Sequence, residues 1–133
     1  MDARKRVDLK AKLSAQPEPK IVAIDEFFDG NDDEASIGCN LFEHPGIDVF
    51  RRILLNIRGR ADVVAVYAQI SEVDPGEDYW PFADWVFVVG AISQHDLALA
   101  LAPLQPDDVG PPEHDVPEAI ARHDAPVLAA WWD

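Results

Sequence analysis

Cysteine and glycine are scarce in this chain, and each scarcity excludes a class of protein. The single cysteine, Cys39, cannot form a disulfide within the chain, so a disulfide-stabilised scaffold is excluded. The seven glycines are not grouped, and no phosphate-binding loop or Gly-x-Ser-x-Gly nucleophile motif is present. The sequence therefore predicts no bound cofactor and no catalytic residue of a known motif.

Long apolar runs are also missing. No run approaches the length of a membrane-spanning helix, and residues 1–16 alternate charged residues with single apolar ones. That pattern lacks the apolar core of a signal peptide. We therefore expect a cytoplasmic location and no membrane contact.

Basic residues become scarce after residue 20. Residues 1–20 contain six Lys and Arg against three Asp and Glu, whereas residues 21–133 contain five against 22, a balance of −17 within a total of −14. A field of this sign repels phosphate backbones and anionic lipid. The charge argues against nucleic acid and favours a basic protein partner, with solubility as the alternative explanation. The oligomeric state stays open.

The length and composition predict one folded domain. A chain of 133 residues is long enough to bury one core, and 48% of the residues are hydrophobic. Residues 1–19 read as a basic N-terminal arm that ends at Pro17 and Pro19, and we expect this arm to be loosely ordered. Residues 20–133 then form a single α+β domain.

The order of predicted elements indicates the fold. Residues 20–24 and 127–132 have the composition of short strands, and residues 62–73 and 85–92 predict an antiparallel hairpin. Prolines interrupt residues 103–126 and exclude most regular structure there.

Two helices complete this order. One shows a single apolar face at Ile47, Phe50, Leu54 and Ile57. The other starts at Ser93, with an acidic residue three positions later that completes a capping box. The resulting βαββαβ order predicts a ferredoxin-like plait, a four-stranded antiparallel sheet with both helices on one face and a proline-rich segment before the last strand.

The densest polar cluster, here called the acidic segment, covers residues 25–34. Its spacing resembles the first half of a calcium-binding loop, but Glu34 replaces the glycine of the sharp turn and Asn40 replaces the bidentate glutamate. We therefore predict no tight calcium site. Asx turns within the loop, or a surface for basic side chains of a partner, explain the cluster instead. Its candidate binding residues are Asp25, Glu26, Asp29, Asn31, Asp32, Asp33 and Glu34.

Tryptophan supplies the second candidate surface. Neighbouring residues of a strand point to opposite faces, so Trp131 and Trp132 cannot both enter one core. One of them packs on the second face of the sheet, is exposed, or enters a partner. Because tryptophan is enriched at binding hot spots, these two residues and Trp80 are candidate binding residues.

Cys39 and His44 are five residues apart, which suggests a thiolate and a base. No sequence feature activates the thiol or orients the histidine, so we expect Cys39 to be a buried and unreactive residue. The other histidines have no zinc-site spacing, and no metal site is predicted.

Four segments together resemble a known family. They are residues 25–41 (DEFFDGNDDEASIGCNL), 44–46 (HPG), 80–84 (WPFAD) and 131–133 (WWD). They look like a family of small acidic bacterial proteins of unknown function. The resemblance implies a bacterial cytoplasmic origin and transfers no site, and the arm before Lys20 lies outside it.

Two functions fit these observations. The first is a non-catalytic interaction domain that offers an acidic, tryptophan-containing surface to a basic protein, for example an immunity protein that neutralises a basic toxin. The alternative is a small hydrolase or metal-dependent enzyme that uses the carboxylates of the acidic segment with His44. An enzyme needs those groups to converge in a pocket, whereas a binding domain needs an exposed face.

Overall fold

The computed structural model describes residues 1–133 and contains one five-stranded sheet. All neighbouring strands are antiparallel, and their order across the sheet is β1-β2-β3-β5-β4. The strands are β1 (Lys20–Ala23), β2 (Val63–Glu72), β3 (Phe82–Gly90), β4 (Asp108–Gly110) and β5 (Val127–Trp131).

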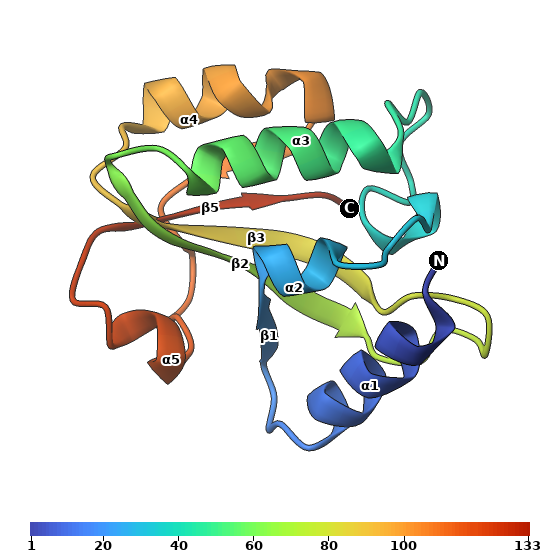
Figure 1. Ribbon diagram of the computed structural model, residues 1–133. Helices are drawn as coiled ribbons and strands as arrows, with labels where there is room; N and C mark the ends of the chain where they lie inside the picture. Colours follow the sequence, from blue (N-terminus) through green and yellow to red (C-terminus); the bar gives the residue numbers. More distant parts are fainter.

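Five helices surround this sheet. They are α1 (Ala3–Ser14), α2 (Ile24–Phe28), α3 (Ile47–Arg58), α4 (Gln94–Leu101) and α5 (Glu118–Ala121), with single 3₁₀ turns at Glu34–Ser36 and Ala102–Leu104. Figure 1 shows α3 and α4 side by side over one face of the sheet and α5 below the other face. None of the helices has the length and apolarity needed to cross a membrane.

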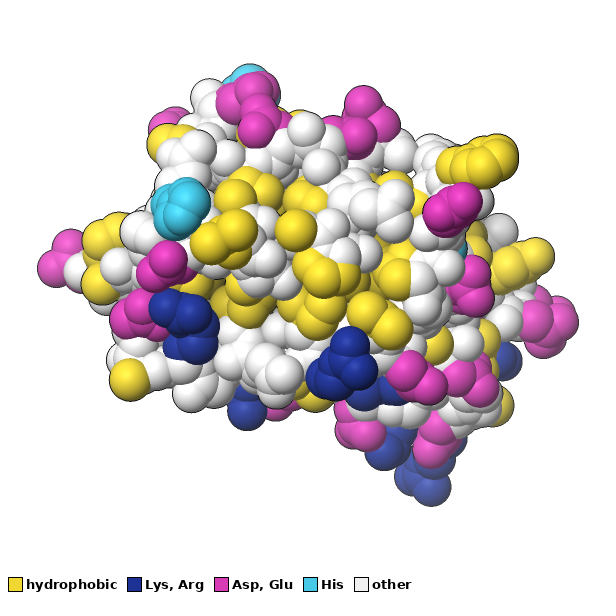
Figure 2. Space-filling view, turned by 90° about the horizontal axis from the view of Figure 1, so that it is seen from above, with side chains coloured by type: hydrophobic (Ala, Val, Ile, Leu, Met, Phe, Trp, Pro, Cys, Tyr) yellow, Lys and Arg dark blue, Asp and Glu magenta, His cyan; other side chains and the backbone are white.

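Helix α3 confirms the apolar spacing read from the sequence. Ile47, Phe50, Leu54 and Ile57 are all buried in the main core. The chain enters the helix through Gly46, whose φ of 106° is a conformation that favours glycine. Seen from above in Figure 2, apolar side chains run along the middle of the α3 and α4 face, and charged side chains lie around its margin.

The β2–β3 hairpin is also confirmed. Its residues alternate between two cores: Val66 and Ala68 join the main core under α3 and α4, whereas Tyr67 packs against a smaller core on the second face. That smaller core includes Ile120 of α5. Both faces of the sheet are therefore partly covered.

The predicted four-stranded ferredoxin-like plait is wrong. In a split βαβ unit the strands before and after the helix run parallel, but β1 and β2 flank α3 and pair directly as antiparallel neighbours. The fifth strand, β4, lies inside the proline-rich segment and occupies the edge of the sheet next to β5. The two helices predicted from the sequence, α3 and α4, do lie on one face, as predicted.

The N-terminal segment is helical rather than loosely ordered. Asp2 caps α1 by accepting hydrogen bonds from the backbone N–H groups of Arg4 and Lys5. Leu9 and Leu13 of this helix are buried in the main core. Burial of two leucines fixes α1 to the domain, although few of its residues are apolar.

Candidate binding surface

Several carboxylates of the acidic segment form ion pairs with the chain's own cations. Lys5 Nζ lies 2.7 Å from Asp29 Oδ1, and Lys12 Nζ lies 2.8 Å from Glu26 Oε2. Both lysines belong to α1, so the basic helix packs beside the acidic segment.

Two further carboxylates of the segment are paired. The N-terminal ammonium lies 2.6 Å from Asp32 Oδ2, and Arg58 Nη1 lies 3.4 Å from Asp25 Oδ2. The hydrogen bond from the N-terminal ammonium lowers the pKa of Asp32, and the hydrogen bond to Asp29 raises the pKa of Lys5. Four of the seven candidate residues of the acidic segment are therefore already paired within the chain.

Other residues of the acidic segment hold the loop itself together. Asn31 is fully buried; its Nδ2 donates to Ser36 Oγ at 2.9 Å, and its Oδ1 accepts from the Asp33 N–H at 2.9 Å. Asp33 in turn accepts from the backbone N–H groups of Ala35 and Trp80, both at 3.0 Å. These contacts fit the Asx-turn explanation of the cluster.

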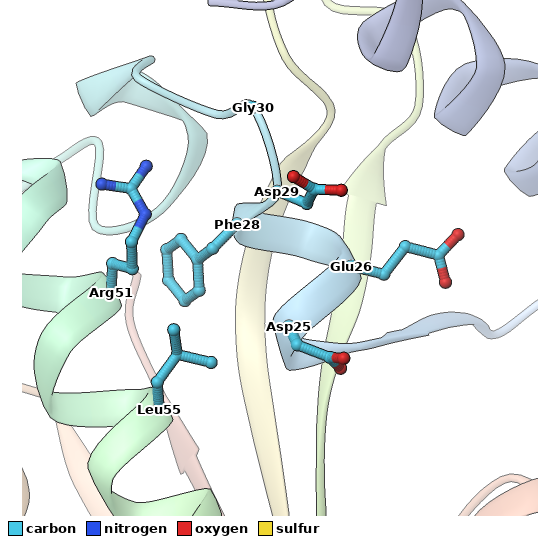
Figure 3. Close-up of a pocket in the computed structure, with 7 residues that line it drawn as sticks. All are labelled: Asp25, Glu26, Phe28, Asp29, Gly30, Arg51 and Leu55. Atoms are coloured by element: carbon cyan, nitrogen blue, oxygen red, sulfur yellow. The ribbon is translucent and has the colours of Figure 1, made fainter.

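The carboxylates of the acidic segment do not converge on a reaction centre. An open depression of about 590 Å³ lies between α2 and α3, lined by Asp25, Glu26, Asp29 and, on the α3 side, Arg51. In Figure 3 the three carboxylates point away from Arg51 and from the neighbouring Phe28 ring. No three Asp, Glu, His or Cys side chains lie together in a group that could hold a metal ion.

His44 is fixed by two backbone groups. Its Nε2 donates to the Ile37 carbonyl at 2.8 Å, and its Nδ1 accepts from the Gly46 N–H at 2.9 Å. Glu34 approaches Nδ1 at 3.5 Å. Because both ring nitrogens already have partners, His44 does not present a free base to the depression.

The expected burial of Cys39 is wrong, because its side chain is exposed. The preceding residue takes the inward position: a Cβ on Gly38 would lie 2.8 Å from Phe50 Cζ, and the backbone there has a φ of 66°. The next side chain therefore points outward. Only the apolar neighbours of the cysteine, not its orientation, were visible in the sequence.

Two of the three candidate tryptophans lie in the core. Trp80 is fully buried, and Trp132 is buried with its Nε1 donating to the Leu104 carbonyl at 2.8 Å. Trp131 lies on the opposite face and packs with the smaller core. The prediction that Trp131 and Trp132 face opposite ways is confirmed, while Trp80 and Trp132 are buried in the main core.

Trp131 stacks on Trp85, and we call this pair the tryptophan platform. Their ring centroids are 4.6 Å apart and their planes meet at 22°. Both rings are only partly buried. The pair follows from the register of the sheet, because Gln69, Trp85, Trp131 and Asp108 are successive cross-strand partners on β2, β3, β5 and β4.

A cavity of about 220 Å³ adjoins the tryptophan platform. Its aromatic wall is formed by Trp85 and Phe87. Gln69, Pro19 and the loop of residues 112–115 complete it, and Glu113 and Asp115 of this loop are exposed. The cavity thus combines aromatic faces with two carboxylates.

Residues 4–130 match the uncharacterized protein YfbO family. The chain belongs to this family. No curated protein and no solved structure matches the chain. The family description names no activity, which agrees with the resemblance to proteins of unknown function. The sequence had suggested that the arm before Lys20 lies outside the family. The match begins at residue 4, so nearly all of α1 lies inside the region shared with the YfbO family.

The charge of this YfbO family member is concentrated in its second half. Residues 1–60 contain ten Lys and Arg against eleven Asp and Glu, whereas residues 61–133 contain one against fourteen, a net charge of −13. Asp108, Glu113 and Asp115 take part in none of the ion pairs of this half, which involve Asp62, Asp74, Asp96 and Glu118.

The sequence contained signals for this surface that were not used. Trp85 and Trp131 both lie in predicted strands, but their contact depends on strand order, which the plait assigned incorrectly. The charge division at residue 60 was readable directly.

Proposed function

We propose that this protein is a non-catalytic interaction domain that binds a basic protein through the tryptophan platform and its surrounding carboxylates. The carrying observation is the stacked, partly exposed pair of Trp85 and Trp131 within a half of the chain whose net charge is −13. An immunity protein that neutralises a basic toxin is one version of this function.

An arginine side chain matches the chemistry of the tryptophan platform. Its planar guanidinium stacks on an aromatic ring and donates hydrogen bonds in a fork that fits a carboxylate. Trp85 supplies the ring, and Glu113 and Asp115 supply the carboxylates beside it. The excess negative charge around the platform would steer a basic partner toward it.

The acidic segment is a weaker binding surface than the tryptophan platform. A partner's lysine or arginine would have to displace Lys5, Lys12 or Arg58 from the carboxylates that they already contact. The enzyme alternative lacks geometric support, since the carboxylates of the acidic segment diverge and His44 is bound to backbone groups.

Titration with a peptide of alternating arginine and glycine tests the proposal. Calorimetry should detect binding to the wild-type protein, and Trp85→Ala should weaken it about tenfold or more, since hot-spot tryptophans carry much of the binding energy of an interface. Phe42→Ala is the matched control, because Phe42 is 99% exposed and lies outside the platform and its cavity. Equal affinity of the Trp85→Ala variant and the wild type would reject the proposal.

A further inference from the structure

Three segments that the sequence singles out meet at one cavity. Residues 38–40, 82–84 and 132–133, together with Ser71, line a space of about 250 Å³. A bridge between Ile37 and Ala83 and a hydrogen bond of 2.9 Å from the Trp132 N–H to the Asp84 carbonyl hold the segments together. We call this space the Asp84 pocket.

Asp84 occupies an irregular place in β3. Trp85 pairs with Gln69 and Ala83 pairs with Ile70, so Asp84 is an extra residue without a Cα partner on β2. Such a β-bulge redirects a side chain, and bulges are common next to functional sites.

One oxygen of the Asp84 carboxylate lacks a donor. Its Oδ1 is buried and has no hydrogen-bond partner. Burial raises the pKa of this carboxyl group; a hydrogen bond from the residue's own backbone lowers it by a smaller amount, and the negative charge of Asp133 raises it. A buried acceptor without a partner is costly, and each such group calls for an explanation. Because Asp84 also lines the pocket, a cation bound there would offset this cost by neutralising the carboxylate.

The walls of the Asp84 pocket indicate which donor fits. Phe82 and Trp132 contribute aromatic surface, while Asn40 and Ser71 contribute neutral polar groups. This lining does not supply the set of carboxylate or imidazole ligands that a metal ion takes, but aromatic rings beside a carboxylate suit an organic cation. The volume is below that of usual drug-sized sites, so the ligand group is small.

We propose that the Asp84 pocket binds an ammonium or guanidinium group at the end of a short aliphatic chain, with that group donating a hydrogen bond to the Asp84 carboxylate. The Asp84 pocket shares no lining residue with the cavity of the tryptophan platform, so this inference does not rest on the proposed function. The cation is carried either by a small amine or by a basic side chain of a peptide.

Two probes separate these sources. Agmatine presents the cation on a small molecule, and a blocked glycine-arginine-glycine peptide presents it on a backbone. Binding is followed by amide NMR shifts at Gly38, Ser71 and Asp84, which all line the pocket. Binding by either probe supports the proposal and identifies the source, whereas no saturable shift with either probe up to about 10 mM, near the weak limit of specific affinity, overturns it.

The decisive variant is Asp84→Asn, which keeps the shape of the side chain and removes its charge. It should weaken the binding of the active probe about tenfold or more, as expected for loss of a charged hydrogen bond. Asp78→Asn is the matched control, because Asp78 is exposed and outside the pocket, and it should leave the affinity within about twofold. Equal affinity of Asp84→Asn and wild type would overturn the proposal, as would equal binding of uncharged butanol or a preference for magnesium ions.

Cys39 provides a second readout that works even if the variant is unstable. Its thiol is exposed and lines the Asp84 pocket. Saturating probe should therefore slow the labelling of Cys39 in the wild-type protein by a disulfide reagent. An unchanged labelling rate at saturation would place the probe elsewhere and contradict the proposal.

Discussion

The acidic segment and the surroundings of the tryptophan platform are both rich in carboxylates, but only those of the acidic segment are paired with cations of the chain. In the acidic segment, Asp29 and Glu26 pair with lysines of α1, and Asp32 pairs with the N-terminal ammonium. Near the platform, Glu113 and Asp115 form no ion pair. A dense acidic run in a sequence therefore does not reveal where a protein presents free charge, because a basic helix elsewhere in the chain can neutralise it.

The largest effect on stability should come from weakening the packing of α1 on the domain. Leu13→Ala should lower the free energy of unfolding by about 2–5 kcal/mol, because it removes methyl groups from a fully buried position. Val7→Ala on the same helix is the control, since Val7 is 58% exposed, and it should cost less than about 0.5 kcal/mol. Denaturation with urea measures both, and equal small losses would mean that α1 is not part of the core.

An intermediate effect should come from Asp84, whose side chain is partly buried and whose Oδ1 has no hydrogen-bond donor. The pKa of Asp84 is raised in the folded protein, so the folded state holds its proton more tightly than the unfolded state. Stability therefore falls as pH rises from the ordinary pKa of an aspartate through the raised pKa, and above the raised pKa the cost of the buried charge stays constant. Asp84→Asn should raise the melting temperature at neutral pH, and the difference should shrink as pH falls through the raised pKa and vanish below the ordinary pKa of an aspartate.

Thermal melts of wild type, Asp84→Asn and Asp78→Asn across this pH range check the sign. The exposed Asp78 should show no such pH-dependent gain. A lower melting temperature for Asp84→Asn at neutral pH would indicate that the carboxylate has a stabilising partner that the geometry does not show.

The smallest effect should come from a single ion pair of the acidic segment. Lys12→Gln removes the contact with Glu26, and both side chains are largely exposed. Exposed pairs contribute at most about 1 kcal/mol and are screened by salt. The loss of stability should therefore be small in dilute buffer and disappear at high salt. Arg52→Gln, at an exposed residue without an ion pair, should change nothing in either condition.

Local structure was largely readable from the sequence, whereas tertiary pairing was not. The apolar spacing of Ile47, Phe50 and Leu54 predicted α3, because helical periodicity depends only on neighbouring residues. The alternation that sends Trp131 and Trp132 to opposite faces was readable for the same reason.

The errors concern contacts between distant segments. Strand β4 forms between Pro106 and Pro111, where prolines had argued against regular structure, because its three residues Asp108–Gly110 contain no proline and keep their N–H donors. Leu9 and Leu13 are buried against residues far away in the sequence. The charged residues around them in α1 gave no sign of this contact. For the candidate site, the stacking of Trp85 on Trp131 required the correct strand order.

One measurement tests most directly whether the free acidic surface lies at the tryptophan platform. Two triple variants each change the net charge from −14 to −11: Asp25→Asn with Asp29→Asn and Asp32→Asn, and Asp108→Asn with Glu113→Gln and Asp115→Asn. The association rate of the arginine-glycine peptide is measured against salt concentration for both. The platform triple variant should associate more slowly and show a weaker salt dependence, while the acidic-segment triple variant should stay closer to wild type, because exposed unpaired charges near the site steer encounter. A flatter salt dependence in the acidic-segment variant than in the platform variant would contradict the account.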